Sequence, residues 1–324
     1  RKAVVRRIPG SLASLVSRFA SDVYWLGRYL ERAENLARIL DINETYARDD
    51  AAGPDWGRVL TLYGERSRFE EIHGFPTARG VLDFYLIDRG NPSSVKSCIH
   101  AARENARSIR HLISTEMWTQ LNIFHIAVGR MKPSDASIEQ LSRVSRQIIA
   151  GCQHFEGVAE GTFLRSEPWC FYQLGKYIER ADQTTRILDM GYDRLAPAED
   201  NPVAWVHWNV LLRSVSGYHA YRNRHPGAST PQDIASFLLY DEEFPRAVAL
   251  CVNRITGSLR ELERRHGSQR GEEAERERRK LEFLIETGPG KSLTPARLHR
   301  FLDETQAALA NVSASVSGCY FAGR

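Results

Sequence analysis

Apolar residues recur along nearly the whole chain at intervals of three and four positions, and no stretch shows the strict alternation of a half-buried strand. The pattern breaks at glycine- and proline-containing stretches such as Gly53-Pro54 and Gly90-Asn91-Pro92. It therefore predicts an all-α fold. We expect helices at residues 17–47, 55–72, 77–87, 93–128, 134–160, 167–194, 202–222, 231–239, 244–266, 272–287 and 294–319.

One long segment of this pattern occurs twice. YWLGRYLERAENLARILD at 24–41 returns as YQLGKYIERADQTTRILD at 172–189, with eleven of eighteen residues identical. A second pair follows in the same order, since FYLIDRGNPSSVKSCI from Phe84 aligns with FLLYDEEFPRAVALCV from Phe237. We therefore expect an internally duplicated helical bundle with two similar halves in a pseudo-two-fold relation. The expected divisions are a basic N-terminal tail at 1–15, a first repeat at 16–165 and a second repeat at 166–324.

These motifs resemble those of the bacterial alpha-E family, which is named for its helices and its ER motif. The resemblance is carried by both ER segments, by YLIDRGNPSSVKSCIHAARENARSIRHLISTEMWTQLN and by FLLYDEEFPRA, and it covers roughly residues 16 to 324. Members are typically encoded beside, or fused to, an unusual ATP-grasp ligase, often with a transglutaminase-like protease nearby. The resemblance thus implies the ligase as a partner and the protease as a further candidate, in peptide or amide-bond chemistry. It leaves open which protein is the catalyst.

Composition limits the classes of function. With 324 residues, 42% of them hydrophobic, the chain can bury a substantial core. Its 44 basic and 40 acidic residues are mixed along the sequence, so there is no one-sided basic patch for nucleic acid. No apolar run approaches the roughly 20 residues that span a bilayer, and no secretory leader follows the basic start. We expect a cytoplasmic protein that binds neither nucleic acid nor membrane.

The five cysteines are odd in number and form no CxxC pair; they are Cys98, Cys152, Cys170, Cys251 and Cys319. In a chain of this size they are expected to be reduced thiols buried in helices rather than disulfides or metal ligands. The sequence also contains no glycine-rich phosphate loop, no HExxH and no GxSxG. We therefore expect no metal and no cofactor.

Each ER segment, as a helix, carries a charged stripe along one face, because residues three and four apart lie on the same side. The two stripes differ only by conservative changes, and a merely solvated face has little reason to keep its charges in such register. We expect the stripes to be enclosed, either sharing one site near the pseudo-two-fold axis or each facing its own half. The candidate polar cleft comprises Arg28, Glu31, Arg32, Glu34, Arg38, Lys176, Glu179, Arg180, Asp182 and Arg186.

The ER motif itself predicts contacts between helices. Glu31 and Arg32 point about 100° apart on a helix and cannot pair with each other. Glu31 can instead meet Arg28, which lies three residues away. Arg32 and Arg180 are each expected to be largely buried and to reach an acidic side chain or a backbone carbonyl on another helix. The cleft is open to three interpretations: a buried ion-pair lattice, a ligand or docking site, or a catalytic site.

A second polar face lies on the helix expected at 93–128. Its members, which share one side of that helix, are Arg103, Arg107, Arg110 and Ser114. Such a face could receive a phosphate or carboxylate through charge-assisted hydrogen bonds. The second half has GSLRELERRHG in its place. Either a single functional site built on a symmetric frame or ordinary sequence drift would produce this asymmetry.

Three hypotheses of function follow. The first is an accessory or substrate-presenting helical partner of an ATP-grasp-type ligase in peptide or amide-bond formation or modification. The second is an enzyme in which Glu31 or Glu179 is a general acid or base and the neighbouring arginines hold a carboxylate- or phosphate-bearing substrate. The third is a structural helical interaction module. No catalytic residue is assigned, and the oligomeric state is left open.

Overall fold

The structure, a computed structural model, describes residue 15 and residues 17–48, 55–195, 202–227, 230–289 and 293–322. Every regular element in these ranges is a helix, so the all-α prediction is confirmed. The tail expected at 1–15 lies outside the described residues except for Leu15. Over the same ranges, no helix combines the length and the apolar character that crossing a bilayer requires.

The helices follow one another along the chain with short connections. They are α1 (Ser17–Arg48), α2 (Gly57–Leu62), α3 (Arg66–His73), α4 (Ala78–Leu86), α5 (Val95–Ser108), α6 (Thr115–Gly129), the 3₁₀ turn η1 (Pro133–Asp135), α7 (Ile138–Thr162), α8 (Glu167–Leu195), α9 (Pro202–Ser214), α10 (Tyr218–Arg224), α11 (Pro231–Tyr240), α12 (Val248–His266), α13 (Ser268–Thr287), α14 (Pro295–Val316) and the π-helical turn η2 (Ser317–Phe321).

Three segments expected as single helices each divide into two, and the one at 93–128 divides into α5 and α6. The 55–72 segment breaks between α2 and α3, where Gly64 has a φ of +67°. The 202–222 segment breaks between α9 and α10, where Ser216 has a φ of 58°. A residue in the left-handed region cannot continue a right-handed helix. Apolar periodicity continues through the breaks at Gly64 and Ser216, so the hydrophobic pattern alone does not reveal them.

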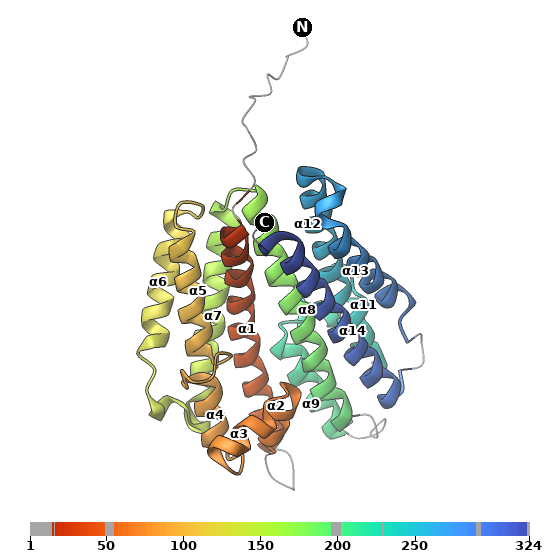
Figure 1. Ribbon diagram of the computed structural model, residues 1–324. Coiled ribbons are helices and arrows are strands. Elements are labelled where there is room, and N and C mark those ends of the chain that lie inside the picture. The colour runs from red at the N-terminus through yellow and green to blue at the C-terminus, as the bar shows by residue number, and fades with distance from the viewer. Residues whose placement is uncertain are drawn as a thin grey trace.

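Helices α1 and α8, which carry the two ER segments, lie side by side at the centre of the molecule (Figure 1). Helices α5 and α7 pack against α1, whereas α12 and α14 pack against α8. In Figure 1 these outer helices stand on opposite sides of the central pair, with α2, α3 and α4 at one end. The charged stripes are therefore placed in the interior of the bundle.

The two central helices approach each other closely at Gly27 and Gly175. A Cβ atom on Gly27 would lie 2.6 Å from the carbonyl oxygen of Tyr172, and one on Gly175 would come still closer to that of Tyr24. Only a residue without a Cβ allows the backbones to come this near. The close approach brings the polar faces of α1 and α8 into direct contact.

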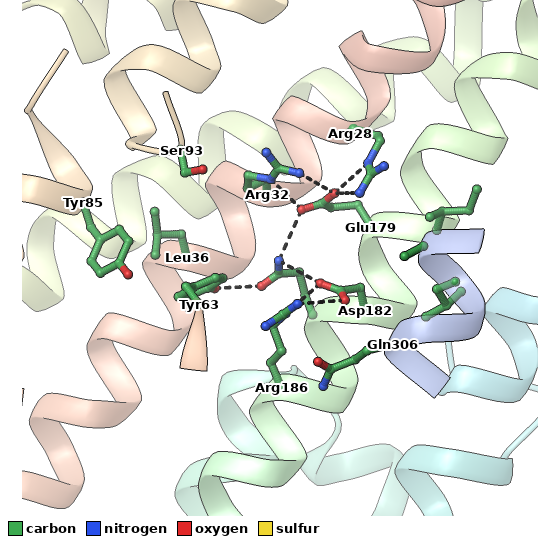
Figure 2. A pocket seen from close by; sticks show the side chains of 14 residues that line it. Arg28, Arg32, Leu36, Tyr63, Tyr85, Ser93, Glu179, Asp182, Arg186 and Gln306 are labelled. Atoms are coloured by element: carbon green, nitrogen blue, oxygen red, sulfur yellow. Dashed lines mark hydrogen bonds and ion pairs between the residues drawn. The ribbon is translucent and has the colours of Figure 1, made fainter. Parts of the chain in front are cut away.

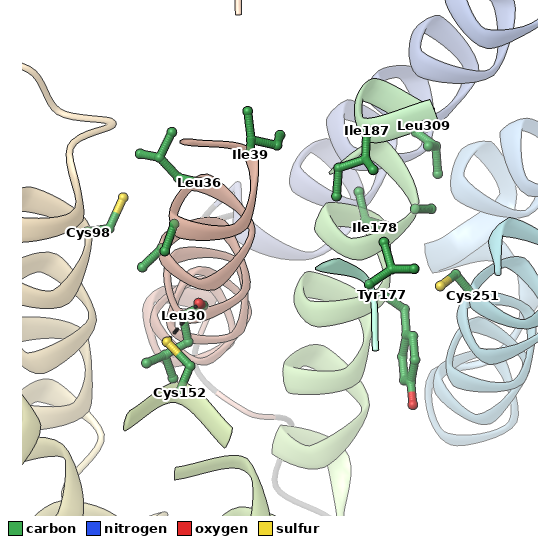
Figure 3. Packing of buried hydrophobic residues seen from close by; sticks show 14 of the residues in the cluster. Leu30, Leu36, Ile39, Cys98, Cys152, Tyr177, Ile178, Ile187, Cys251 and Leu309 are labelled. Atoms are coloured by element: carbon green, nitrogen blue, oxygen red, sulfur yellow. Dashed lines mark hydrogen bonds between the residues drawn. The ribbon is translucent and has the colours of Figure 1, made fainter. Parts of the chain in front are cut away.

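One continuous hydrophobic core surrounds this central pair. Figure 3 shows Cys98 on the side of α5 that faces α1, and Cys251 on the side of α12 that faces α8. Both thiols are fully buried, and burial raises the pKa of each to about 12. All five cysteines lie in the described ranges, and none forms a disulfide. Cys98 and Cys251 therefore pack as small apolar groups, as the sequence predicts.

Candidate functional site

The ER motifs of the central helices pair crosswise. Arg32 on α1 donates Nε to Glu179 Oε1 at 2.7 Å and Nη2 to Glu179 Oε2 at 3.0 Å. Arg180 on α8 donates Nε to Glu31 Oε1 at 2.9 Å and Nη2 to Glu31 Oε2 at 2.7 Å. Both pairs are bidentate, which is the strongest geometry for an arginine and a carboxylate. The expected contacts to another helix are present; Arg180 is buried, and the Arg32 side chain is 22% exposed.

A second tier of ion pairs lies about one turn further along each helix. Arg38 pairs with Glu34 at 2.6 Å on α1, and Arg186 pairs with Asp182 at 2.8 Å on α8. Arg38 Nη1 also donates to the last carbonyl of α9, and Arg186 Nη1 donates to the last carbonyl of α2. Carbonyls at a helix C-terminus lack partners within the helix, so these contacts satisfy them. The second tier thus ties α1 to α9 and α8 to α2.

Arg246, in the loop before α12, fills the space around Glu31. Its Nη1 donates to Glu31 Oε1 at 3.0 Å and to Asn35 Oδ1 at 2.9 Å, and its Nη2 pairs with Glu34. The Arg246 side chain is 8% exposed, so a buried guanidinium occupies this space. In the aligned sequence segments, Ser93 stands at the position of Arg246.

Around Glu179 the corresponding space is open. The short Ser93 side chain leaves a cavity of about 300 Å³ between α1, α8 and α14 (Figure 2). Its apolar wall consists of Leu36, Ile178, Leu309 and Ala310. Its polar wall consists of Arg28, Arg32, Tyr63, Tyr85, Ser93, Glu179, Asp182, Gln183, Arg186 and Gln306. We call this space the Glu179 cavity.

The Glu179 carboxylate is held by two arginines. Besides the Arg32 contacts, Arg28 donates Nε to Glu179 Oε2 at 2.8 Å and Gln183 donates Nε2 to Oε1 at 3.2 Å. Burial alone would raise the pKa of Glu179, but the positive charges of Arg32 and Arg28 lower it to about 2. Glu179 is therefore ionised and fully hydrogen-bonded at neutral pH.

Glu31 is in the same electrostatic state. Its burial also favours the protonated form, but Arg180 and Arg246 outweigh this effect and hold its pKa well below the usual range. The pKa of Arg180 is raised in turn, because the attraction of Glu31 exceeds the cost of burying the guanidinium. A general acid or base works best with a pKa near the operating pH, and neither Glu31 nor Glu179 meets that condition at neutral pH.

Two tyrosines line the Glu179 cavity. The Tyr63 hydroxyl donates to Gln183 Oε1 at 2.7 Å. Tyr85 is 1% exposed, and its hydroxyl has no hydrogen-bond partner among the described residues. Figure 2 shows the hydroxyl end of Tyr85 turned toward Tyr63. A buried hydroxyl without a partner costs about 1–3 kcal/mol, and this unpaired hydroxyl belongs to a residue of the cavity wall.

Nine of the ten residues of the expected polar cleft occupy two neighbouring places. Those that line the Glu179 cavity are Arg28, Arg32, Glu179, Asp182 and Arg186. Those that surround the filled space at Glu31 are Glu31, Glu34, Arg38 and Arg180. Lys176 instead pairs with Glu156 on α7. The contact of Glu31 with Arg28 that the helical spacing allows is not the one formed, because Arg28 turns to Glu179 on the neighbouring helix.

The face expected to bind an anion on a single 93–128 helix is not continuous. The residues concerned are Arg103, Arg107, Arg110 and Ser114. Helix α5 ends at Ser108, and the Ser114 hydroxyl begins α6 by accepting a hydrogen bond from the Met117 amide at 3.0 Å. The break separates Arg110 and Ser114 from the face of the other two. Glu104 pairs with both Arg103 and Arg107 at 2.6 Å, so both guanidinium groups already have a carboxylate partner.

Several residues that shape the cavity were not among those expected from the sequence. They are Tyr63, Tyr85, Ser93, Gln183, Gln306 and, around Glu31, Arg246. A signal is nevertheless present in the aligned segments, where Ser93 stands against Arg246 and Tyr85 against Leu238. The cavity arises at positions where the repeats differ, whereas the expected site rested on positions where they agree.

The chain is similar to one protein family and to several longer proteins. The family model for Alpha-E, "a predicted alpha-helical domain with a conserved ER motif", matches residues 15–321. Uncharacterised proteins of Mycobacterium bovis and of two Mycobacterium tuberculosis strains are 25% identical over 284 residues, which is 81% of this chain. The match covers 32% of each of these proteins, so the chain spans about a third of their length. No solved structure matches the chain significantly.

Proposed function

The chain belongs to the Alpha-E family, and on that premise we propose that it is a substrate-presenting helical partner of an ATP-grasp-type ligase in peptide or amide-bond formation or modification. The Glu179 cavity is the observation that carries this proposal. Pockets for small molecules are concave, partly apolar and furnished with a few convergent polar groups, and this cavity has those properties. In this proposal the protein acts in the cytoplasm, with a transglutaminase-like protease as a further candidate partner.

The electrostatics of the site favour presentation of a substrate over catalysis by this chain. Glu31 and Glu179 have lowered pKa values and are engaged by arginines from both central helices. Proton transfer by either group at neutral pH would first require an ion pair to break. The ER residues therefore suit the role of a rigid frame that keeps the cavity in shape.

The length of the mycobacterial relatives also supports a partnership. This chain matches about a third of each relative, so the Alpha-E part of those proteins is joined to further polypeptide. The identity of that partner as an ATP-grasp ligase rests on the family resemblance alone.

We also propose that the bundle is an internal duplication, with halves at 16–165 and 166–324. The reciprocal contacts support this view, because Arg32 meets Glu179 as Arg180 meets Glu31. The close approach is reciprocal as well, since Gly27 faces Tyr172 as Gly175 faces Tyr24. In such a frame, one copy of the site has been filled by Arg246 and the other remains open.

Reconstitution with the ATP-grasp protein encoded nearby tests the proposal. Ser93→Arg places in the open site the residue that fills the other one, and it should lower turnover of the ligase complex without reducing ATP binding by the partner. Ala150→Arg, which adds the same charge at an exposed position of α7, is the matched control and should leave turnover unchanged. A thermal melt of both variants checks that the bundle is folded.

Two outcomes would contradict the proposal. Equal ligase turnover of the wild-type and Ser93→Arg complexes, with both variants folded, would remove the cavity from the function. Robust turnover of substrate by the isolated chain would instead favour an enzyme in its own right.

A further inference from the structure

The Glu179 cavity carries an excess of positive charge. Three guanidinium groups line it, those of Arg28, Arg32 and Arg186, against two carboxylates, those of Glu179 and Asp182. One positive charge is therefore left without a partner of opposite sign in the wall. Since a buried charge is costly unless it is paired, the cavity favours an occupant with a single negative charge.

The two carboxylates in the wall are already engaged, which weighs against a cationic occupant. Glu179 receives hydrogen bonds from Arg28, Arg32 and Gln183. Asp182 is held by Arg186 through Nε at 2.8 Å and Nη2 at 3.1 Å. A ligand ammonium or guanidinium group would have to displace an arginine from one of these carboxylates.

Donor groups, in contrast, remain free. Arg32 uses Nε and Nη2 for Glu179, and its Nη1 has no partner within the described ranges. Tyr85 offers a buried hydroxyl that is likewise unpartnered there. Burial raises the pKa of Tyr85, so the phenol keeps its proton and can donate it to an anion. A carboxylate can accept hydrogen bonds from both a guanidinium and a hydroxyl.

The remaining wall and the size of the cavity limit the rest of the ligand. Leu36 of α1, Ile178 of α8 and Leu309 of α14 form an aliphatic surface that can cover an apolar body. About 300 Å³ is at the lower end of the range for small-molecule pockets. The ligand is therefore compact, with one charged end and an aliphatic remainder.

We propose that the Glu179 cavity binds a small aliphatic monocarboxylate, with its carboxylate at Arg32 and Tyr85 and its hydrocarbon part against Leu36 and Leu309. This inference rests on the proposed function, because it names the class of substrate held in the same cavity. It applies to one half of the bundle only. At Glu31 the space is taken by Arg246, and Leu238 stands in the aligned sequence where the open site has Tyr85.

Isothermal titration calorimetry of the full chain with three probes of similar shape tests the charge preference. Isocaproate should bind, whereas neutral isocaproamide and cationic isohexylammonium should bind at least about tenfold more weakly, because neither supplies a charged acceptor. Absence of isocaproate binding up to about 10 mM would overturn the proposal. So would binding of isohexylammonium as tight as that of isocaproate.

Variants then place the ligand in the cavity. Tyr85→Phe should weaken isocaproate binding by about tenfold, and Ser93→Arg should abolish it. Tyr240→Phe is the matched control, since it removes another buried hydroxyl that has no described partner but lies outside this cavity. Isocaproate binding that neither Tyr85→Phe nor Ser93→Arg changes, in variants with wild-type melting temperatures, would place the site elsewhere and overturn the proposal.

The two proposals fail in different experiments. If calorimetry shows carboxylate binding in the cavity but Ser93→Arg leaves ligase turnover unchanged, the substrate-presenting function is wrong and the ligand class stands. If Ser93→Arg lowers turnover but isocaproate does not bind, the cavity is functional and the ligand class is wrong.

Discussion

The regions around Glu31 and Glu179 neutralise a buried carboxylate in two different ways. Each buried glutamate is neutralised by the arginine of the opposite ER motif and by one further arginine. For Glu31 the further arginine is Arg246, which enters from the loop before α12. For Glu179 it is Arg28, which lies on the same helix as Arg32, one turn earlier. The first arrangement fills the space over the carboxylate, and the second leaves it open.

This difference shows that the ion pairs do not require the cavity. Both glutamates have two guanidinium partners. Burying a carboxylate requires such charge pairing, and both regions provide it. The cavity is not needed for that purpose, since the Glu31 region is stable without one. Function is therefore better sought in the cavity and its tyrosines than in the ER residues themselves.

The largest effect should come from removing one glutamate at a time. Glu31→Gln leaves Arg180 without its carboxylate and Arg246 with Glu34 alone, and their side chains are only 10% and 8% exposed, so it should lower the free energy of unfolding by about 3–5 kcal/mol. Glu179→Gln should cost less, because Arg28 and Arg32 are 14% and 22% exposed and water can reach them. Urea denaturation measures both. If Glu179→Gln lowers the free energy of unfolding as much as Glu31→Gln or more, then access of water at the open site does not reduce the cost of leaving its arginines unpaired.

Acid should destabilise the protein through these same carboxylates. The folded-state pKa of Glu179 is lowered from 4.5 to about 2, so its ion pairs stabilise the fold above about pH 4.5 and this contribution is lost as the pH falls toward 2. The contribution of one such group is of the order of 3 kcal/mol. Urea denaturation between pH 6 and about pH 2.5 should therefore show a shallower loss of stability for Glu179→Gln than for the wild type. Parallel curves would contradict the assigned role of Glu179.

Exchanging the residues that distinguish the two regions should have unequal effects. Arg246→Ser removes one guanidinium partner from both Glu31 and Glu34 and a donor from Asn35, and it should cost about 2 kcal/mol. Ser93→Arg adds a fourth guanidinium to a cavity wall that already has one excess positive charge, so it should also lower stability, but only by about 1 kcal/mol because water can reach the half-buried position. Thermal melts of the two variants make the comparison. Strong destabilisation by Ser93→Arg would mean that the cavity cannot accept a guanidinium.

The smallest expected difference concerns the packing of Arg32. Its stem lies between the central helices while its head reaches Glu179, so Arg32→Met should retain volume that Arg32→Ala loses. We expect Arg32→Met to be more stable than Arg32→Ala by about 1 kcal/mol, because both variants leave Glu179 with Arg28 alone. Denaturation midpoints of the pair decide this, and equal midpoints would show that charge alone matters at this position.

Much of the fold could be predicted from the sequence, and the limits have identifiable causes. The long ER helices were placed within a residue or two, because a continuous apolar stripe with a 3.6-residue period is a local property. The breaks near Gly64 and Ser114 were missed, because the apolar spacing continues across them. Arg32 and Arg180 were expected to reach another helix, since neither can pair with its adjacent glutamate.

The cavity depended on contacts that no local pattern contains. Whether Arg28 turns to Glu31 or to Glu179 depends on which carboxylate lies nearer once the two backbones meet at Gly27 and Gly175. The role of Arg246 is visible only after its loop reaches the face of α1, far away in sequence.

The sequence by itself determined that the chain is helical, that two segments share one charged pattern and that their arginines need partners elsewhere, because periodicity and the reach of a side chain are properties of short segments. The tertiary structure decided which carboxylate each arginine meets and which of two similar spaces is open. The reason is that elements distant in the chain must come together before a space exists between them. Only then does a long side chain such as Arg246 fill the space, or a short one such as Ser93 leave it open.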